Sequence, residues 1–173
     1  MNIIFLTMSR LTGISNRGIY SDLLRKFRDE GHNVYILTPE ERGCDSWFTV
    51  HGSRLVEVDG VHILRVKTLN LQKTNVIEKG IGQILVENQY KRAIKKCLSN
   101  VKFDLILYST PPITFPKVIA YLKRKNPQAK SYLLLKDIFP QNAVDLGMLT
   151  ASVRASWFTV HGWVEPLKYQ LYK

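Results

Sequence analysis

Three polar segments contain the residue types that could bind or transfer a substrate. The first, residues 8–18, contains Arg10, Arg17 and Gly18 just ahead of a predicted helix. Basic side chains beside a helix N-terminus suit a phosphate or a sugar hydroxyl. The segment contains neither GxGxxG nor GxxxxGK[ST], so it is not a nucleotide-binding fingerprint. In the alternative interpretation Arg17 is solvated and Gly18 only lets the loop turn.

The other two segments follow later strands. Asp137 comes directly after a predicted strand, where a carboxylate can orient or deprotonate a hydroxyl; it could instead cap a turn. Lys136 and Gln141 of the same loop are substrate-binding candidates. So are Thr110 and Pro111, although the pair of prolines here serves equally well to start a helix.

The sequence contains no convincing catalytic pair or metal-ligand cluster. Its two cysteines, Cys44 and Cys97, belong to no CxxC or Cys/His pattern, so neither a zinc site nor a disulfide framework is predicted. His32 and His62 lie in or beside strand patterns and are expected to be structural. We therefore expect no bound metal.

One heptapeptide occurs twice. Residues 46–52 and residues 156–162 both read Ser-Trp-Phe-Thr-Val-His-Gly. No periodic array accompanies the repeat, so a solenoid is excluded. A duplicated binding loop and a local duplication without function both remain open, and we assign no chemistry to it.

The elements that must position these candidates alternate between strand and helix. Apolar runs predict buried strands at residues 2–7 and 33–38, and further strands are predicted at residues 103–108 and 131–135. Pro39 is expected to end the second of these. Two short strand patterns within residues 55–67 flank the turn Asp59-Gly60. Apolar residues at helical spacing, with suitable end signals, predict helices at residues 18–31, 75–99 and 110–125, and a short one from residue 142.

This alternation predicts an α/β fold: a Rossmann-like doubly wound sheet, mainly parallel, in a three-layer α/β/α arrangement. In such sheets ligands bind in the crevice outside the carboxyl ends of the strands. Three segments fall there: residues 8–18, 108–112 and 136–142.

Composition and charge agree with a globular protein that has an anionic partner. The chain has 173 residues, of which 45% are hydrophobic, so disorder and collagen-like repeats are excluded. Lys and Arg number 25 against 14 acidic residues, a net charge of +11 that favours a polyanionic surface or ligand.

Much of the basic surplus lies near the ends of the predicted helices. Cations there complement the helix dipole, but three basic helix ends could also face an anionic membrane. The three clusters are Arg25, Lys26 and Arg28; Lys91, Arg92, Lys95 and Lys96; and Lys123, Arg124 and Lys125. Nucleic acid is an unlikely partner by sequence, because no RNP pattern or GXXG loop is present.

The N-terminus predicts a cytoplasmic protein. It has no basic n-region, and the polar Thr7 soon interrupts its apolar run, so it is not a signal peptide. No apolar run approaches the roughly 20 residues that span a bilayer. We expect a peripheral protein on the inner face of the plasma membrane.

Four stretches, at residues 2–7, 17–34, 103–112 and 135–144, together resemble one known family. They are similar to the N-terminal domain of bacterial GT-B glycosyltransferases of the family 4 type, which build capsule or O-antigen polysaccharide. The likeness covers most of residues 1–43 and 53–150.

The resemblance implies an activity and a division of labour. Such enzymes have two Rossmann-like domains: the N-terminal one receives the acceptor, here a lipid-linked saccharide, and the C-terminal one holds the nucleotide-sugar. Transfer usually retains anomeric configuration and uses no bound metal, and no other cofactor is implied. Arg17-Gly18 matches the family's glycine-rich loop, although many members have a second glycine in place of Arg17. Asp137 matches its acidic residue, with Lys136 replacing the usual His.

The resemblance also implies a domain organisation. Residues 1–150 would form the acceptor-side domain, residues 151–173 an atypical segment, and the donor-binding domain would be absent or supplied by a partner chain. We therefore expect this chain alone not to transfer sugar. The alternative is a non-catalytic Rossmann-like module that docks to an anionic membrane or a partner protein through Trp47, Trp157 and Trp163.

Overall fold

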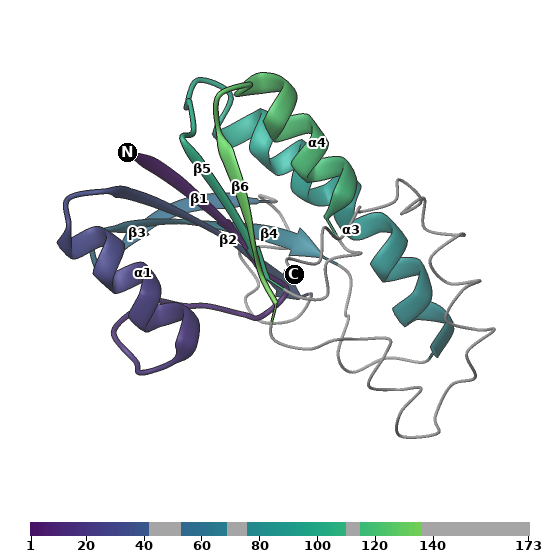
Figure 1. Cartoon of the computed structure of the whole chain (residues 1–173). Coiled ribbons are helices and arrows are strands. Elements are labelled where there is room, and N and C mark those ends of the chain that lie inside the picture. The colour runs from purple at the N-terminus through teal and green to yellow at the C-terminus, as the bar shows by residue number, and fades with distance from the viewer. Residues whose placement is uncertain (42–52, 69–75, 110–114, 136–173) are drawn as a thin grey trace, which may run out of the picture. The chain divides into compact units, whose positions relative to one another are not determined.

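The computed structural model describes residues 1–41, 53–68, 76–109 and 115–135 (Figure 1). By its contacts the chain divides into two compact units, Met1–Leu134 and Leu135–Lys173, and the described helices and strands all belong to the first unit. The predicted domain boundary at residue 150 falls outside the described residues and stays a prediction.

The described strands form one six-stranded sheet in the order β3-β4-β2-β1-β5-β6. All neighbouring pairs are parallel except β3 and β4, which form an antiparallel hairpin. The bounds are β1 Asn2–Leu6, β2 Asn33–Glu41, β3 Arg54–Val58, β4 Val61–Thr68, β5 Leu105–Ser109 and β6 Lys130–Leu134.

Three helices of the described residues cover the two faces of this sheet (Figure 1). They are α1 Ile19–Asp29, α3 Val76–Cys97 and α4 Pro116–Lys125. α1 lies on one face, and α3 and α4 lie side by side on the other. The predicted Rossmann-like, doubly wound, three-layer α/β/α fold is confirmed.

Strand β1 lies at the centre of the sheet and is buried on both faces. Ile3 and Phe5 belong to the core on one side, while Ile4 and Leu6 pack in the core against α3 and α4. Because side chains alternate between faces, a strand covered on both sides needs an unbroken apolar run, which is the pattern seen in the sequence. β2 flanks β1 on one side and β5 on the other, so the topological switch point lies between β1 and β5.

The predicted end of helix α1 is confirmed in detail. The N–H of His32 donates to the carbonyl of Phe27 and the N–H of Gly31 to that of Arg28, the two bonds of a Schellman motif. Gly31 has a φ of 79°, which glycine adopts without strain. The helix therefore ends there, and β2 begins at Asn33.

The predicted hairpin turn is also confirmed. Asp59 and Gly60 have φ values of 56° and 73°, and two positive values in succession are typical of the type I′ turn that joins two strands closely. It connects β3 and β4 with Val58 paired to Val61.

Two predicted boundaries are wrong. β2 does not end before Pro39 but continues to Glu41, with Pro39 paired to Val66 of β4. The carbonyl of Leu37 accepts from Thr7 on the β1 side. Pro39 lies two residues further along β2, so its backbone faces the same side as that of Leu37. β1 has already ended at this level, so no neighbouring strand lies there to accept a hydrogen bond from residue 39. The N–H that proline lacks is therefore not needed in the sheet.

The helix expected to open at Thr110 also has a different start. It begins at Pro116 instead, with Phe115 as its N-cap. Pro116 fits the first helical turn because its φ is preset and its absent N–H would have no helical partner there. The prolines at 111 and 112 lie outside the described residues.

Candidate functional site

Buried polar side chains gather where the parallel strands reach their carboxyl ends. Thr7 follows β1 and Ser109 ends β5, so the two flank the switch point, and both are fully or almost fully buried. The Ser109 hydroxyl donates to Thr7 Oγ1 over 3.2 Å, and the Ser9 N–H donates to the same oxygen over 3.0 Å. These hydroxyls thus satisfy one another and fix the point at which the loop after β1 leaves the sheet.

Tyr90 of α3 completes this buried arrangement. Its hydroxyl donates to the Thr7 carbonyl over 2.8 Å, and its ring packs on Phe115 at the start of α4. Burial raises the pKa of Tyr90 well above the ordinary tyrosine value, because the phenolate would have no solvent. Tyr90 therefore remains a neutral hydrogen-bond donor that ties α3 to the end of β1.

The loop after β1 is held against β2 by Thr38. The Leu11 N–H donates to Thr38 Oγ1 over 2.8 Å, and the same hydroxyl donates to the Ser9 carbonyl over 3.0 Å. The Thr38 hydroxyl thus accepts a hydrogen bond from one backbone group of the loop and donates one to another.

Glu40 holds the next part of this loop through an ion pair. Arg10 Nη2 lies 2.9 Å from Glu40 Oε1; the carboxylate side chain is 2% exposed, whereas the Arg10 side chain is 46% exposed. Arg65 of β4 is also near this carboxylate: its Nε lies 3.9 Å from Oε2, and that nitrogen has no hydrogen-bond partner among the described residues. The sequence-predicted Arg10 is therefore brought to the carboxyl edge of the sheet, with its side chain about half exposed.

A second anchor joins the loop to the β3–β4 hairpin. Asp59 Oδ2 accepts from the N–H groups of Ile14 and Ser15 over 3.0 and 3.1 Å. The pKa of Asp59 is lowered by a hydrogen bond from the Ser15 side chain, by the hydrogen bond from the Ile14 N–H and by the positive charge of Arg28. Gly13 is required for this approach, since a Cβ there would lie 2.7 Å from the carboxylate oxygen.

The remaining sequence candidates of the loop stand at the start of α1. Arg17 and Gly18 are exposed, and Gly18 is the N-cap without a side-chain hydrogen bond. Its carbonyl accepts the first helical bond, from Asp22. Arg25 of α1 donates to the carbonyls of Ile14, Ser15 and Asn16, and so fixes the chain that leads to this helix start.

Five predicted site residues lie outside the described residues. They are Thr110, Pro111, Lys136, Asp137 and Gln141. Both copies of the repeated heptapeptide lie there as well. Their assigned roles stay predictions.

The predicted membrane-facing residues differ in what they contact. Arg25 and Arg28 are hydrogen-bonded within the fold, the latter to the Asp59 carbonyl over 2.8 Å. Lys123 and Lys125 donate to the carbonyls of Ala129 and Ser99.

The remaining residues of these clusters behave differently. Lys26 pairs with Glu30, and Arg124 is exposed. Lys91 and Lys95 both lie over the Tyr121 ring of α4, whereas Arg92 and Lys96 line a pocket on another side of α3.

Sequence reasoning missed Thr7, Glu40, Tyr90 and Ser109. A signal existed for Thr7 and Ser109, since each is the polar residue that closes an apolar strand run. Glu40 was overlooked because the strand was expected to stop at Pro39. Tyr90 gave no local signal, because its partner Thr7 lies 83 residues away in the sequence.

The described part of the chain contains no cluster of three His, Cys, Asp or Glu side chains that could hold a metal ion. Among the same residues, no helix is both long enough and apolar enough to span a membrane.

The chain matches no protein-family model, and no curated protein sequence matches it.

Proposed function

We propose that residues 1–150 form the acceptor-binding domain of a glycosyltransferase that moves a sugar from a nucleotide-sugar to a lipid-linked saccharide in surface polysaccharide biosynthesis. The observation that carries the proposal is the loop after β1, which leaves the sheet beside the β1/β5 switch point and is anchored by Thr38, Glu40 and Asp59. A loop fixed at the switch point of a doubly wound sheet is where such folds bind ligands.

The stretches that resemble family 4 GT-B enzymes support the same site. Residues 2–7 include β1, residues 17–34 include α1, and residues 103–112 include β5, so the resemblance coincides with the elements that flank the switch point. Arg10 at the edge of the sheet, with Arg17 and Gly18 at the start of α1, would bind acceptor hydroxyls or its diphosphate. Asp137 would orient or deprotonate the acceptor hydroxyl.

The protein would work as a peripheral protein on the cytoplasmic face of the plasma membrane, where its lipid-linked acceptor is found. Its net charge of +11 favours that position, since anionic lipids attract a basic surface.

Acceptor binding tests the proposal. Flotation of the full chain with vesicles that contain a polyprenyl-diphosphate-linked monosaccharide should show tighter binding than with vesicles that contain polyprenyl phosphate alone. Arg17→Gln should weaken this preference, whereas Arg124→Gln should leave it unchanged, because Arg124 lies at the end of α4, at the opposite edge of the sheet. Equal binding to the two kinds of vesicle would contradict the proposal.

Catalysis separates the enzyme from the docking module. With a donor-binding domain supplied, Asp137→Asn should lower the transfer rate by a factor of about 10² to 10⁴, the usual contribution of a general base. An unchanged transfer rate would remove Asp137 from the mechanism. Membrane binding without any transfer would favour the non-catalytic docking module.

A further inference from the structure

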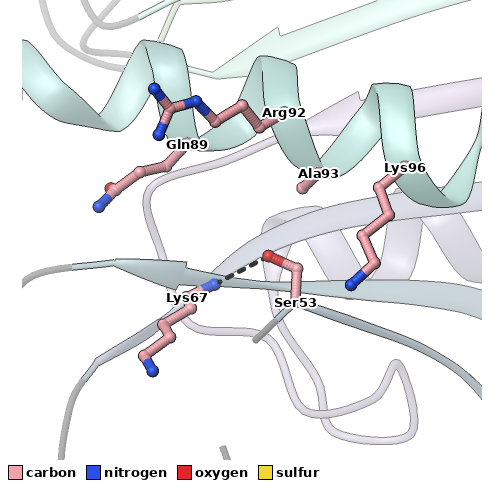
Figure 2. A pocket seen from close by; sticks show the side chains of 6 residues that line it. All are labelled: Ser53, Lys67, Gln89, Arg92, Ala93 and Lys96. Atoms are coloured by element: carbon pink, nitrogen blue, oxygen red, sulfur yellow. Dashed lines mark hydrogen bonds between the residues drawn. The ribbon is translucent and has the colours of Figure 1, made fainter. Parts of the chain in front are cut away.

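A pocket between α3 and the β3–β4 side of the sheet has an unusual set of charges. It has a volume of about 200 Å³ and is lined by Ser53, Lys67, Gln89, Arg92, Ala93 and Lys96 (Figure 2). Half of these side chains are cationic, and none is acidic. None of them belongs to the anchored loop after β1, so the pocket is a separate feature of the fold.

The two helix-borne cations of this pocket carry charge that nothing nearby neutralises. Arg92 and Lys96 are one helical turn apart on α3, a spacing at which like charges repel. Neither has an ion pair or a hydrogen bond with any residue in the described part of the chain. In Figure 2, Lys96 extends from α3 toward Ser53, across the pocket. Arg92 runs along α3 toward Gln89, so the two cations line different parts of the pocket, and a bound anion would relieve their repulsion.

Two polar groups add to the charge. The Ser53 hydroxyl accepts from the Lys67 N–H over 3.3 Å, which leaves its own proton available to a further acceptor. Gln89 Oε1 is shielded from solvent and has no hydrogen-bond partner among the described residues. Rotation of that amide by a half turn would present its NH₂ group as a donor instead. The pocket can thus offer neutral donors beside its cations.

The size of the pocket limits its ligand. Sites for whole drug-sized molecules or cofactors have volumes of roughly 300–1,000 Å³. The volume of about 200 Å³ suits a charged headgroup and not an entire nucleotide. Arg and Lys side chains recognise phosphate oxygens through short charge-assisted hydrogen bonds, and a monoester presents more charge than a diester.

We propose that this pocket is a binding site for a phosphomonoester group, held by Arg92, Lys96 and the Ser53 hydroxyl. The inference does not depend on the glycosyltransferase proposal, since it uses none of the residues assigned to the acceptor. It also divides the basic residues of α3 by role: Arg92 and Lys96 line the pocket, and Lys91 and Lys95 lie over the Tyr121 ring.

That division supplies a matched control. Two double variants remove the same charge from the same helix: the first pair is Arg92→Gln with Lys96→Gln, and the second is Lys91→Gln with Lys95→Gln. Calorimetric titration of the full chain with glycerol 3-phosphate should show affinity reduced about tenfold or more in the first pair, because at least one charge-assisted hydrogen bond is lost. In the second pair the affinity should stay within about twofold, since only long-range charge changes. Equal losses in both pairs would overturn the proposal.

Vesicles identify the source of the phosphate. Phosphatidylcholine vesicles with phosphatidic acid present the monoester on a lipid, and vesicles with phosphatidylglycerol present a diester. If only binding to phosphatidic acid vesicles depends on Arg92 and Lys96, the ligand is a lipid headgroup. If only binding of glycerol 3-phosphate depends on them, the ligand is a free metabolite. Dependence for neither would refute the site.

A measurement on the unmodified chain keeps the test independent of folding. On addition of glycerol 3-phosphate, the amide NMR signals of Ser53 and Lys67 should shift, because the Lys67 N–H donates to the Ser53 hydroxyl that would bind phosphate. The amide of Arg124 should not move. Unchanged Ser53 and Lys67 signals at saturating glycerol 3-phosphate would rule the pocket out.

Discussion

At the scale of single residues, most polar groups at the carboxyl edge of the sheet hold the fold and leave few for a ligand. Thr7 illustrates this, since its hydroxyl, its carbonyl and its N–H are all hydrogen-bonded. Arg10 differs, because its charge is fixed by Glu40 while its side chain remains half exposed. Buried groups therefore position the loop, and exposed groups on it are the ones a ligand can reach.

Tyr90→Phe should destabilise the fold by about 1–3 kcal/mol, the cost of leaving a buried carbonyl unpaired. The substitution removes only the hydroxyl that donates to the Thr7 carbonyl and keeps the ring against Phe115. Urea unfolding monitored by circular dichroism measures the loss. Tyr132→Phe, at a residue that is 60% exposed, is the control and should change stability little. A loss no larger than that of the control would show that the bond contributes nothing.

The lowered pKa of Asp59 predicts that its contribution to stability is lost at acid pH. Its pKa is lowered in the folded state, so the stabilisation is fully present above the unfolded value of 3.8 and is lost as the pH falls through the folded pKa. Asp59→Asn removes the charge and tolerates the positive φ of 56°. The variant should melt below the wild type at neutral pH, and this difference should shrink as the pH falls below 3.8. A difference in melting temperature that is constant with pH would contradict the assignment.

At the scale of elements, the β3–β4 hairpin does more than extend the sheet. Its turn supplies the Asp59 carboxylate to the loop after β1 and the Asp59 carbonyl to Arg28 of α1. Helix, loop and hairpin are therefore joined at one turn on the α1 side of the sheet. The geometry of that turn depends on Gly60, whose φ of 73° is in the left-handed region.

Gly60→Ala should destabilise the protein by about 1–2 kcal/mol through left-handed strain. It should cost somewhat more than Gly31→Ala, which imposes the same strain at a φ of 79° but meets no neighbour within 4 Å. The added Cβ at residue 60 would instead lie 3.2 Å from Arg28 Cδ and displace its contact with the turn. Thermal unfolding of both variants measures the difference. If Gly60→Ala were as stable as the wild type, the turn could not be the joint described above.

At the scale of the whole first unit, the described helices all run from the carboxyl edge of the sheet to its amino edge. The basic residues at the end of α4 therefore lie at the amino edge, opposite the point where the loop after β1 leaves the sheet, whereas Arg25 and Arg28 of α1 contact residues 14–16 of that loop and the Asp59 turn that anchors it. Lys26 and Arg124 are exposed, and the ion pair that Lys26 makes is with Glu30 on the same helix surface. Any attraction to an anionic surface should depend on such residues more than on Arg25 or Arg28.

Binding to anionic vesicles should fall steeply as salt rises from about 0.1 M to about 1 M, because the Debye length drops from about 10 Å to about 3 Å. Lys26→Gln with Arg124→Gln should weaken this binding without loss of stability. Arg25→Gln should lower stability instead, since Arg25 holds three loop carbonyls. Vesicle cosedimentation and thermal unfolding measure the two effects. Binding that ignored both salt and these substitutions would exclude an electrostatic membrane contact.

The sequence by itself determined the elements and their class. Residues 3–6 are apolar without interruption because β1 is buried on both faces, and this local pattern is readable without a structure. The Asp59-Gly60 turn and the Gly31 helix end are equally local, since each depends on the φ that one or two residues can adopt. Arg10 and Gly18 were placed correctly relative to a strand end and a helix start for the same reason.

Only the tertiary structure decided which side chains meet. Tyr90 and Thr7, Asp59 and Ile14, and Glu40 and Arg10 come together because the sheet orders its strands differently from the chain, and no local pattern records that order. The continuation of β2 past Pro39 also depended on where its neighbour β1 stops. Periodicity reflects burial of one segment, whereas a site is formed by contacts between distant segments. The separation of the four basic residues of α3 between Tyr121 and the pocket has the same origin.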